Sequence, residues 1–332
     1  MRFVKMHGTG NDYIYINLVP GYDDSVRASF DESGNLTHIE DKLVADVVTR
    51  LSDRHFGIGS DGLIAVAPTD NADVRMIMYN ADGSEGSMCG NGIRCVAKFA
   101  YERGLLDGST GDPYPKSIEI ETKSGIKKLT LTIEDDICTY VEVNMGHAIL
   151  TPEEIPFRTE VLEYVSDNVK IATVLPEKRY MEDEIDNIPD GAIVSKILKV
   201  DGKNYPVTCV SMGNPHCVVF TDNIYRIDIE ELGPQFEHHP AFPEQVNTEF
   251  VEVLDDHTLS MRVWERGSGE TMSCGTGTCA ATVAAVLNGY VKRGMETEVR
   301  IRGGKLYDTY LPNGEVLMKG PATTVFEGEV EL

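Results

Sequence analysis

The sequence has few features that would indicate binding to nucleic acid or to a membrane. Its 332 residues include 30 Lys and Arg against 54 Asp and Glu, a formal net charge of −24. This acidic excess argues against nucleic-acid and anionic-membrane partners, although a small anion could still bind a local group of donors. No apolar run has the length of a transmembrane helix, and the first ten residues lack the apolar core of a signal peptide. We therefore expect a cytoplasmic protein.

Cysteine is also scarce, at seven residues, and no C-x-x-C pair is present. These numbers exclude a disulfide framework and give no reason to expect zinc, so we predict no metal. Five of the cysteines fall inside apolar helix-like or strand-like runs, where small core residues are expected: Cys95, Cys138, Cys209, Cys217 and Cys279. The other two, Cys89 and Cys274, stand in a different context.

Cys89 and Cys274 occupy matching positions in a long internal repeat. Residues 78–104 read MYNADGSEGSMCGNGIRCVAKFAYERG, and residues 263–290 read VWERGSGETMSCGTGTCAATVAAVLNGY. One offset of 185 residues (274 − 89) relates the cysteines, an aromatic residue before each turn, an acidic residue in each turn and a glycine after each helix. The repeat predicts two related halves rather than a solenoid, whose period would be far shorter.

The periodicity predicts an α/β (α+β) chain with many short strands and few helices. Helices are expected after Gly92 and Gly277, each closed by a glycine at its C-terminal end, and over residues 43–55, where Leu43 begins an apolar face. Alternating patterns predict strands in both halves, for example at 74–80 and 258–265. Residues 21–42 and 179–192 are polar, and we expect them to be peripheral, loop-like insertions.

The C-G-x-G sequences that start the two repeat helices suggest acid–base chemistry. A helix N-terminus offers unsatisfied N–H groups and a partial positive charge, which bind a carboxylate and lower a thiol pKa from about 8.5 towards neutrality. Glycine lets the backbone approach a ligand closely. Two thiols in different protonation states could remove and return a proton at a carbon beside a carboxylate.

Four motifs together resemble the diaminopimelate epimerase family: MHGTGNDY, NADGSEGSMCGNGIRC, SMGNPH and ERGSGETMSCGTGTCAA. The resemblance is collinear over nearly the whole chain. It implies two pseudo-symmetric domains, each a mostly antiparallel sheet around a central helix, with the active site in the cleft between them. The implied domains are residues 1–145 with Cys89, completed by a C-terminal strand at 320–332, and residues 146–319 with Cys274. It further implies a homodimer that epimerises diaminopimelate in lysine and peptidoglycan biosynthesis without pyridoxal phosphate, metal or nicotinamide.

The resemblance also assigns roles to individual residues. Cys89 and Cys274 match the two catalytic acid/base residues, and Arg266 matches a clamp for the distal carboxylate of the substrate. His216 and Glu265 match residues that tune the thiol pKa values. The amides of four asparagines would bind the far end of the substrate: Asn11, Asn80, Asn214 and Asn247. The backbone of four further residues would hold the reacting carboxylate: Gly90, Asn91, Gly275 and Thr276. Glu265 would be a further contact with the substrate.

The chain departs from the family pattern at one position, and three other functions are alternatives to the epimerase. Relatives often carry Gln where this chain has Gly62 in GIGSDG, so we expect one polar group near the site to be missing or supplied by another residue. Another two-thiol racemase of this fold would act on proline, hydroxyproline or histidine, but Arg266 and the asparagines favour a second carboxylate and amine. A cysteine-free isomerase, as in phenazine biosynthesis, is disfavoured by Cys89 and Cys274. A thiol redox or metal-binding protein would more often contain C-x-x-C.

Overall fold

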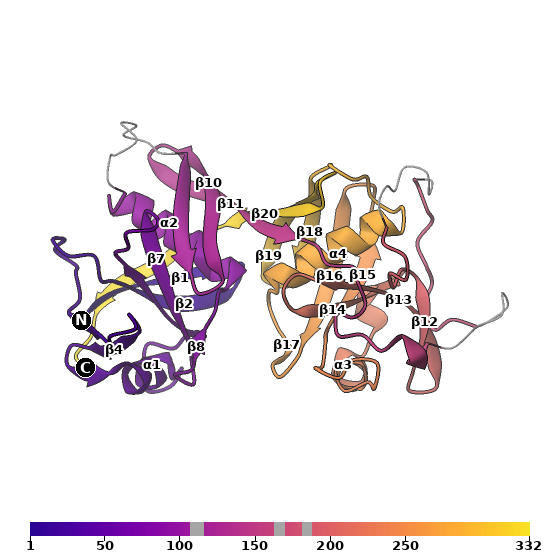
Figure 1. Ribbon diagram of the computed structural model, residues 1–332, viewed down its shortest axis with the longest axis horizontal. Coiled ribbons are helices and arrows are strands. Elements are labelled where there is room, and N and C mark those ends of the chain that lie inside the picture. The colour runs from indigo at the N-terminus through magenta and orange to yellow at the C-terminus, as the bar shows by residue number, and fades with distance from the viewer. Residues whose placement is uncertain (107–115, 163–169, 181–187) are drawn as a thin grey trace. The chain divides into compact units, whose positions relative to one another are not determined.

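The computed structural model describes residues 1–106, 116–162, 170–180 and 188–332 (Figure 1). The chain forms two compact units: unit 1 is Met1–Asn144 with Lys319–Leu332, and unit 2 is Met145–Met318. In Figure 1, unit 1 is coloured indigo to magenta with a yellow final strand, and unit 2 is mostly orange. The chain leaves unit 1 within β11 (Ile137–His147) and returns to it within β20 (Glu315–Pro321).

The sheet of unit 1 has the strand order β21-β1-β2-β6-β7-β9-β10-β11, and β8 pairs with the end of β7. Only the β2–β6 and β7–β9 pairs among these are parallel. The strands are β1 Arg2–Gly8, β2 Asn11–Asn17, β6 Gly62–Ala67, β7 Val74–Asn80, β8 Glu85–Gly86, β9 Ser117–Thr122, β10 Gly125–Glu134 and β21 Thr323–Glu329, together with β11.

The sheet of unit 2 has the order β12-β13-β14-β15-β16-β18-β19-β20, with β17 paired to the end of β16. Its parallel pairs, β14–β15 and β16–β18, stand at the same places as those of unit 1. The predicted repeat is therefore confirmed as a repeat of topology. The strands are β12 Lys196–Val200, β13 Lys203–Ser211, β14 Pro215–Thr221, β15 Asn247–Val253, β16 Thr258–Glu265, β17 Gly269–Glu270, β18 Thr297–Ile301 and β19 Gly304–Tyr310, together with β20.

Each unit packs its sheet around one central helix, as expected. Helix α2 (Gly90–Glu102) contacts β1, β2 and β10, and α4 (Gly275–Leu287) contacts β13, β14 and β19. Every residue of α4 except Thr276 is buried, which agrees with its small and apolar sequence. Gly104 and Gly289 follow the helices with φ of 63° and 72°, the left-handed conformation that glycine adopts without strain. The predicted mixed α/β fold, mostly sheet with few helices, is confirmed.

The prediction for residues 21–42 is wrong. This segment forms most of a three-stranded sheet, β3 (Ala28–Phe30), β4 (Leu36–Ile39) and β5 (Lys42–Leu43), and its Leu36 and Ile39 are buried in the core of unit 1. Most of the polar residues in this segment lie before or between these very short strands, so the pattern resembled a loop. Leu43 pairs in β5 and is 56% exposed, and helix α1 begins one residue later, at Val44–Ser52.

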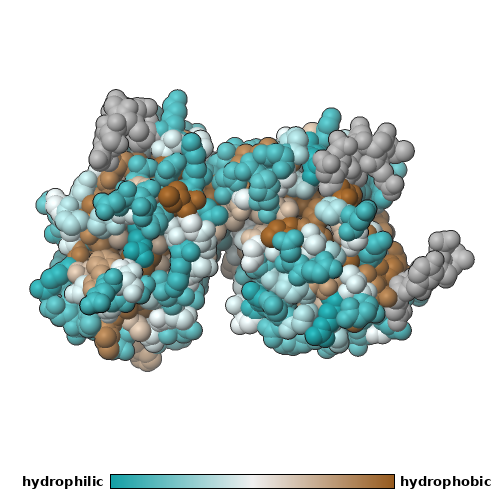
Figure 2. Space-filling model, in the orientation of Figure 1, coloured by the Kyte–Doolittle hydropathy of each residue, from teal (hydrophilic) through white to brown (hydrophobic). Residues whose placement is uncertain are grey.

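The remaining sequence predictions concern the core and the second insertion. The five cysteines assigned to cores are buried, and none of the seven cysteines, all of which are described, forms a disulfide. In the 179–192 segment, residues 181–187 lie outside the described residues. Helix α3 (Ile229–Glu237) was not predicted; with the 3₁₀ turn Ile224–Arg226 it lies between β14 and β15. Figure 2 shows that polar residues cover most of the visible face, with apolar patches between them.

Candidate active site

Cys89 is the N-cap residue of α2, with an extended backbone at φ −129°. Its Sγ accepts a hydrogen bond from the backbone N–H of Gly92 at 3.3 Å. The thiol in turn donates to Oδ1 of Asn11 at 3.1 Å. The thiol therefore lies at the positive end of a central helix, as the C-G-x-G pattern predicted, and it contacts one of the predicted substrate-binding amides.

An acidic residue that the sequence analysis missed fixes the orientation of Asn11. Oδ2 of Asp61 accepts from Asn11 Nδ2 at 2.7 Å, so the amide oxygen is the atom that faces Cys89. Arg54 donates to Asp61 Oδ1 at 2.8 Å and to Asp12 Oδ1 at 2.7 Å, which holds the acid in place. The sequence signal was an aspartate between Ser60 and Gly62, directly before a fully buried strand.

The first turn of α2 is braced by a buried arginine, which sequence reasoning also missed. The Arg94 side chain is fully buried and donates to Asn91 Oδ1 at 2.8 Å and to the Gly90 carbonyl at 3.2 Å. Two of the predicted residues, Gly90 and Asn91, are thereby held beside Cys89. Asn80 is at the exposed end of β7, where its amide donates to Ser84 Oγ at 3.0 Å.

Cys274 is the N-cap residue of α4 and is 5% exposed. Its Sγ lies 3.6 Å from the hydroxyl of Thr276. Ligand atoms of Cys274, His216 and Glu249 all lie within 4.8 Å of one another, and all three residues are buried. The thiol of unit 2 is therefore next to an imidazole and a carboxylate, and Glu249 was not among the predicted residues.

Three predicted residues of unit 2, His216, Asn214 and Thr276, form a continuous hydrogen-bond chain with Glu249. His216 Nδ1 lies 2.7 Å from Glu249 Oε1, and His216 Nε2 lies 3.1 Å from Asn214 Oδ1. Asn214 Nδ2 donates to Thr276 Oγ1 at 3.3 Å, which returns the chain to the helix that carries Cys274. The structure thus brings together three residues that are far apart in the sequence, on β14, on β15 and at the start of α4.

Asn247, Glu265 and Arg266 lie around the turn after β16. Asn247 Oδ1 accepts the backbone N–H of Arg266 at 2.9 Å, and Glu265 accepts the hydroxyl of Thr271. The guanidinium of Arg266 is exposed and donates to the Glu244 carbonyl at 3.0 Å. The Arg266 side chain therefore extends from a turn rather than from a strand.

The expectation of lowered thiol pKa values is also wrong in direction. Burial raises the pKa of Cys89, and the N–H groups of Gly92 and Asn91 with the charge of Arg94 offset this only in part. Burial, followed by the charges of Glu265 and Glu249, raises the pKa of Cys274 well above its ordinary value. In both units the cost of burying a thiolate outweighs the field of the helix N-terminus.

Steric constraints explain why this chain has glycine at position 62. Its φ is 155°, and a Cβ there would lie 2.0 Å from the carbonyl oxygen of Tyr79 on the neighbouring strand. A Gln side chain at position 62 therefore cannot be accommodated on this backbone.

We expect Gly62→Gln to lower the free energy of unfolding by about 2–4 kcal/mol, since it adds a backbone collision to an unfavourable φ. Denaturant titration measures this loss. Gly125→Gln is the matched control, because Gly125 has φ 96° but open space around its Cβ position. Equal losses in the two variants would show that the collision has no cost.

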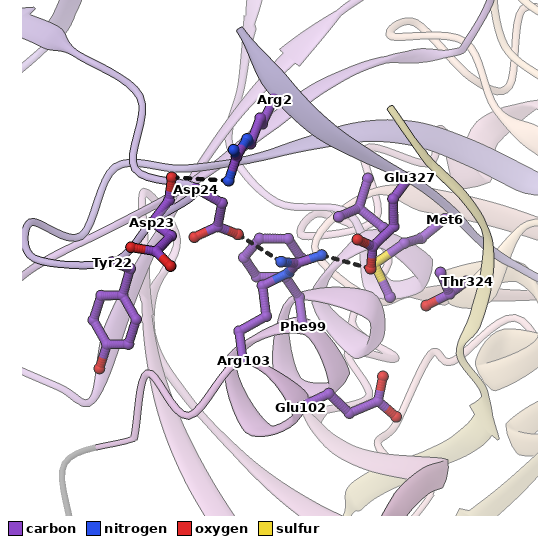
Figure 3. A pocket seen from close by; sticks show the side chains of 11 residues that line it. Arg2, Met6, Tyr22, Asp23, Asp24, Phe99, Glu102, Arg103, Thr324 and Glu327 are labelled. Atoms are coloured by element: carbon purple, nitrogen blue, oxygen red, sulfur yellow. Dashed lines mark hydrogen bonds and ion pairs between the residues drawn. The ribbon is translucent and has the colours of Figure 1, made fainter. Parts of the chain in front are cut away.

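A surface pocket of about 400 Å³ in unit 1 lies apart from these residues (Figure 3). Arg103 stacks over Phe99 there and pairs with Asp24 and Glu327, each at 2.7 Å. Figure 3 shows the guanidinium between the two carboxylates, so its charge is already compensated. The lining residues include no thiol or imidazole, and we do not assign the chemistry to this pocket.

Two groups of described side chains have the residue types and spacing of a metal site. One is His216, Glu249 and Cys274, and the other is the Asp255–His257 segment, which is only partly buried. We assign no metal to the first group, because both nitrogens of its imidazole already have an oxygen partner.

A family sequence model described as "Diaminopimelate epimerase" matches residues 3–151 and 208–325. The diaminopimelate epimerase of Acetivibrio thermocellus is 44% identical over 333 residues, covering 100% of this chain and 99% of the relative. That of Agathobacter rectalis is also 44% identical, over 100% of both chains, and that of Methanococcus maripaludis strain C6 is 43% identical, over 100% of both chains.

Solved structures of lower identity share the fold. A phenazine biosynthesis protein of the PhzF family from Bacillus anthracis matches with a TM-score of 0.61 at 17% identity, covering 100% of this chain and 99% of that chain. A probable proline racemase from Agrobacterium radiobacter K84 has a TM-score of 0.56 at 14% identity, covering 100% and 93%. A hydroxyproline epimerase from Agrobacterium vitis has a TM-score of 0.55 at 15% identity, covering 99% and 90%.

Proposed function

The chain belongs to the diaminopimelate epimerase family, and we propose that it interconverts LL- and meso-2,6-diaminopimelate by a two-thiol mechanism without an added cofactor. This makes the protein an isomerase that acts on a small molecule. The observation that carries the mechanism is the repeat of one arrangement: in each unit a cysteine is the N-cap residue of the central helix, and that helix follows topologically equivalent strands.

In the proposed reaction, one cysteine as thiolate takes the α-proton, and the other as thiol gives a proton to the same carbon. Backbone N–H groups of Gly90 and Asn91, and of Gly275 and Thr276, stabilise the negative charge that develops on the neighbouring carboxylate. The raised thiol pKa values suit this step, because the α-proton is a very weak acid and a thiolate of higher pKa is a stronger base.

We assign recognition of the far end of the substrate to polar side chains. Arg266 would pair with the distal carboxylate, and Asn11, Asn80, Asn214 and Asn247 would bind the distal ammonium and carboxylate groups, with Glu265 as a further contact. His216 and Glu265 would adjust the acidity of the thiols. Proline, hydroxyproline and histidine racemases are the alternative. They are disfavoured because the relatives at 42–44% identity over the whole chain are diaminopimelate epimerases.

A substrate panel tests the assignment. The purified protein, without added cofactor, should epimerise LL- and meso-diaminopimelate and leave lysine, proline, hydroxyproline and histidine unchanged, since lysine lacks the far carboxylate and the others lack both far groups. Chiral chromatography of the products gives the rates. Faster turnover of proline or histidine would overturn the substrate while leaving the two-thiol chemistry in place.

We further propose that the enzyme works in the cytoplasm as a homodimer in lysine and peptidoglycan biosynthesis and needs no nucleic-acid partner. A reaction that depends on two reduced thiols suits a reducing compartment. No helix in the described part of the chain is both long enough and apolar enough to span a membrane.

A further inference from the structure

The buried carboxylate of Glu249 has no assigned role, although it lies beside a reactive thiol. Glu249 is fully buried on β15, and its Oε1 lies 2.7 Å from Nδ1 of His216. Its Oε2 is buried and, among the described residues, has no hydrogen-bond partner. Burying an ionised carboxylate with an unsatisfied oxygen is costly, so a proton nearby is favoured.

The hydrogen bonds of His216 show that the His216–Glu249 pair holds one proton more than a neutral imidazole with an ionised carboxylate would. Both ring nitrogens face oxygens, Glu249 Oε1 and Asn214 Oδ1. A neutral imidazole has one N–H group, so the second contact requires one more proton, either on the ring or on the Glu249 carboxyl. In both cases the Glu249–His216 pair has no net charge.

The backbone next to this pair is shaped around it. A Cβ on Gly277 would lie 2.7 Å from Glu249 Oε1 and 3.1 Å from Sγ of Cys274. Only glycine at this position of α4 lets the carboxylate and the thiol approach the same helix turn. The close approach of the carboxylate and the thiol therefore depends on three residues, Glu249, Cys274 and Gly277.

We propose that Glu249 is a positioning residue for Cys274: with His216 it holds one shared proton, which keeps the surroundings of the thiol neutral while Cys274 gains and loses its own proton. This role rests on the proposed two-thiol function. The carboxylate orients the ring through Nδ1, and loss of the shared proton at higher pH places an anion beside the thiol.

The charges around Cys274 determine the direction in which ionisation of Glu249 shifts the pKa of the thiol. His216 faces it from β14, Glu249 from β15 and Glu265 from β16. Burial raises the pKa of Glu249 to about 7, and the charge of His216 opposes the rise. Above that pH the ionised Glu249 raises the pKa of Cys274 further.

Glu249→Gln tests the proposal, because it keeps the shape of the side chain and removes the charge. We expect the pH dependence of Cys274 alkylation by iodoacetamide, followed on the Cys274 peptide by mass spectrometry, to shift down by about one pH unit. This is about a tenfold faster reaction at mildly alkaline pH. We also expect kcat/KM of the wild type to change near pH 7, where Glu249 ionises, and this change to be absent in the variant. Glu252→Gln, on the same strand but outside the cluster, should change neither.

Wild-type protein provides a second measurement that does not depend on folding of the variant. NMR of the ¹⁵N-labelled His216 ring should show a proton in each of its two hydrogen bonds below pH 7, the one with Glu249 and the one with Asn214. An unchanged alkylation profile in Glu249→Gln, or a wild-type ring with a proton in only one of the two contacts, would overturn the proposal. Both measurements are made without substrate, so failure of the diaminopimelate assignment would leave their outcome unaffected.

Discussion

Replacing Cys89 or Cys274 with alanine should abolish epimerisation, with a loss of at least about 10³-fold in kcat. Each thiol belongs to the N-cap residue of the central helix of its unit, and each would serve one stereochemical direction. Serine should leave only traces of activity, because its hydroxyl is a far weaker acid. Measurement of both the LL-to-meso and the meso-to-LL rates checks the prediction.

The matched controls lie in the same two helices. Cys95 and Cys279 are fully buried inside α2 and α4, so alanine there removes a core sulfur without touching the helix N-termini. We expect Cys95→Ala and Cys279→Ala to keep most of the activity. A Cys274→Ala variant with near-normal rates would rule out the two-thiol mechanism.

Arg266→Met should lower kcat/KM for diaminopimelate by about 10²-fold with both cysteines intact. Hydrogen bonds to charged groups contribute about 1.5–3 kcal/mol each, and a bidentate contact makes two of them. Because the Arg266 guanidinium is exposed, we expect a loss of binding free energy near the lower end of that combined range. The loss should appear on diaminopimelate, whose far carboxylate the arginine would bind. Steady-state kinetics measure it.

Arg300→Met is the control for Arg266, since Arg300 is a half-exposed arginine of unit 2 whose Nε donates to Glu298 at 2.6 Å. It should leave kcat/KM close to that of the wild type. If Arg266→Met kept full activity on diaminopimelate, the distal carboxylate would have to be bound by another residue.

The sequence was most informative where one pattern occurs twice. The matched C-G-x-G units predicted two central helices with Cys89 and Cys274 near their N-termini and closing glycines at their ends, and the strand order of the two sheets repeats in the same way. A repeat constrains the prediction because both copies must satisfy the same packing. The alternation of residues 258–265 likewise gave the bounds of β16.

Short or interrupted elements were not predictable in this way. Strands β3 to β5 span two to four residues each, too few for a period to emerge. Helix α3 has nine residues with Pro234 inside, and only the Asp228 N-cap, whose side chain accepts from Glu231 N–H, marked its start. Proline normally indicates a helix end, so this signal was contradictory.

The polar residues that support the thiols could not be ranked from the sequence, because their roles depend on burial and on partners far along the chain. Asp61 is 50 residues from Asn11, and Glu249 is 33 residues from His216. The field of a helix N-terminus can be inferred from local sequence, whereas the opposing cost of burial depends on the whole fold. The direction of the thiol pKa shift was predicted wrongly for this reason.

Conversion of LL-diaminopimelate in heavy water, with no added cofactor, is the most direct measurement of the central claim that two separate thiols exchange the α-proton. Mass spectrometry of both isomers at low conversion gives the result. The account predicts solvent deuterium at the α-carbon of the meso product, while the recovered LL-diaminopimelate remains protiated. Deuterium appearing equally in both pools, or a product that retains its original proton, would contradict it.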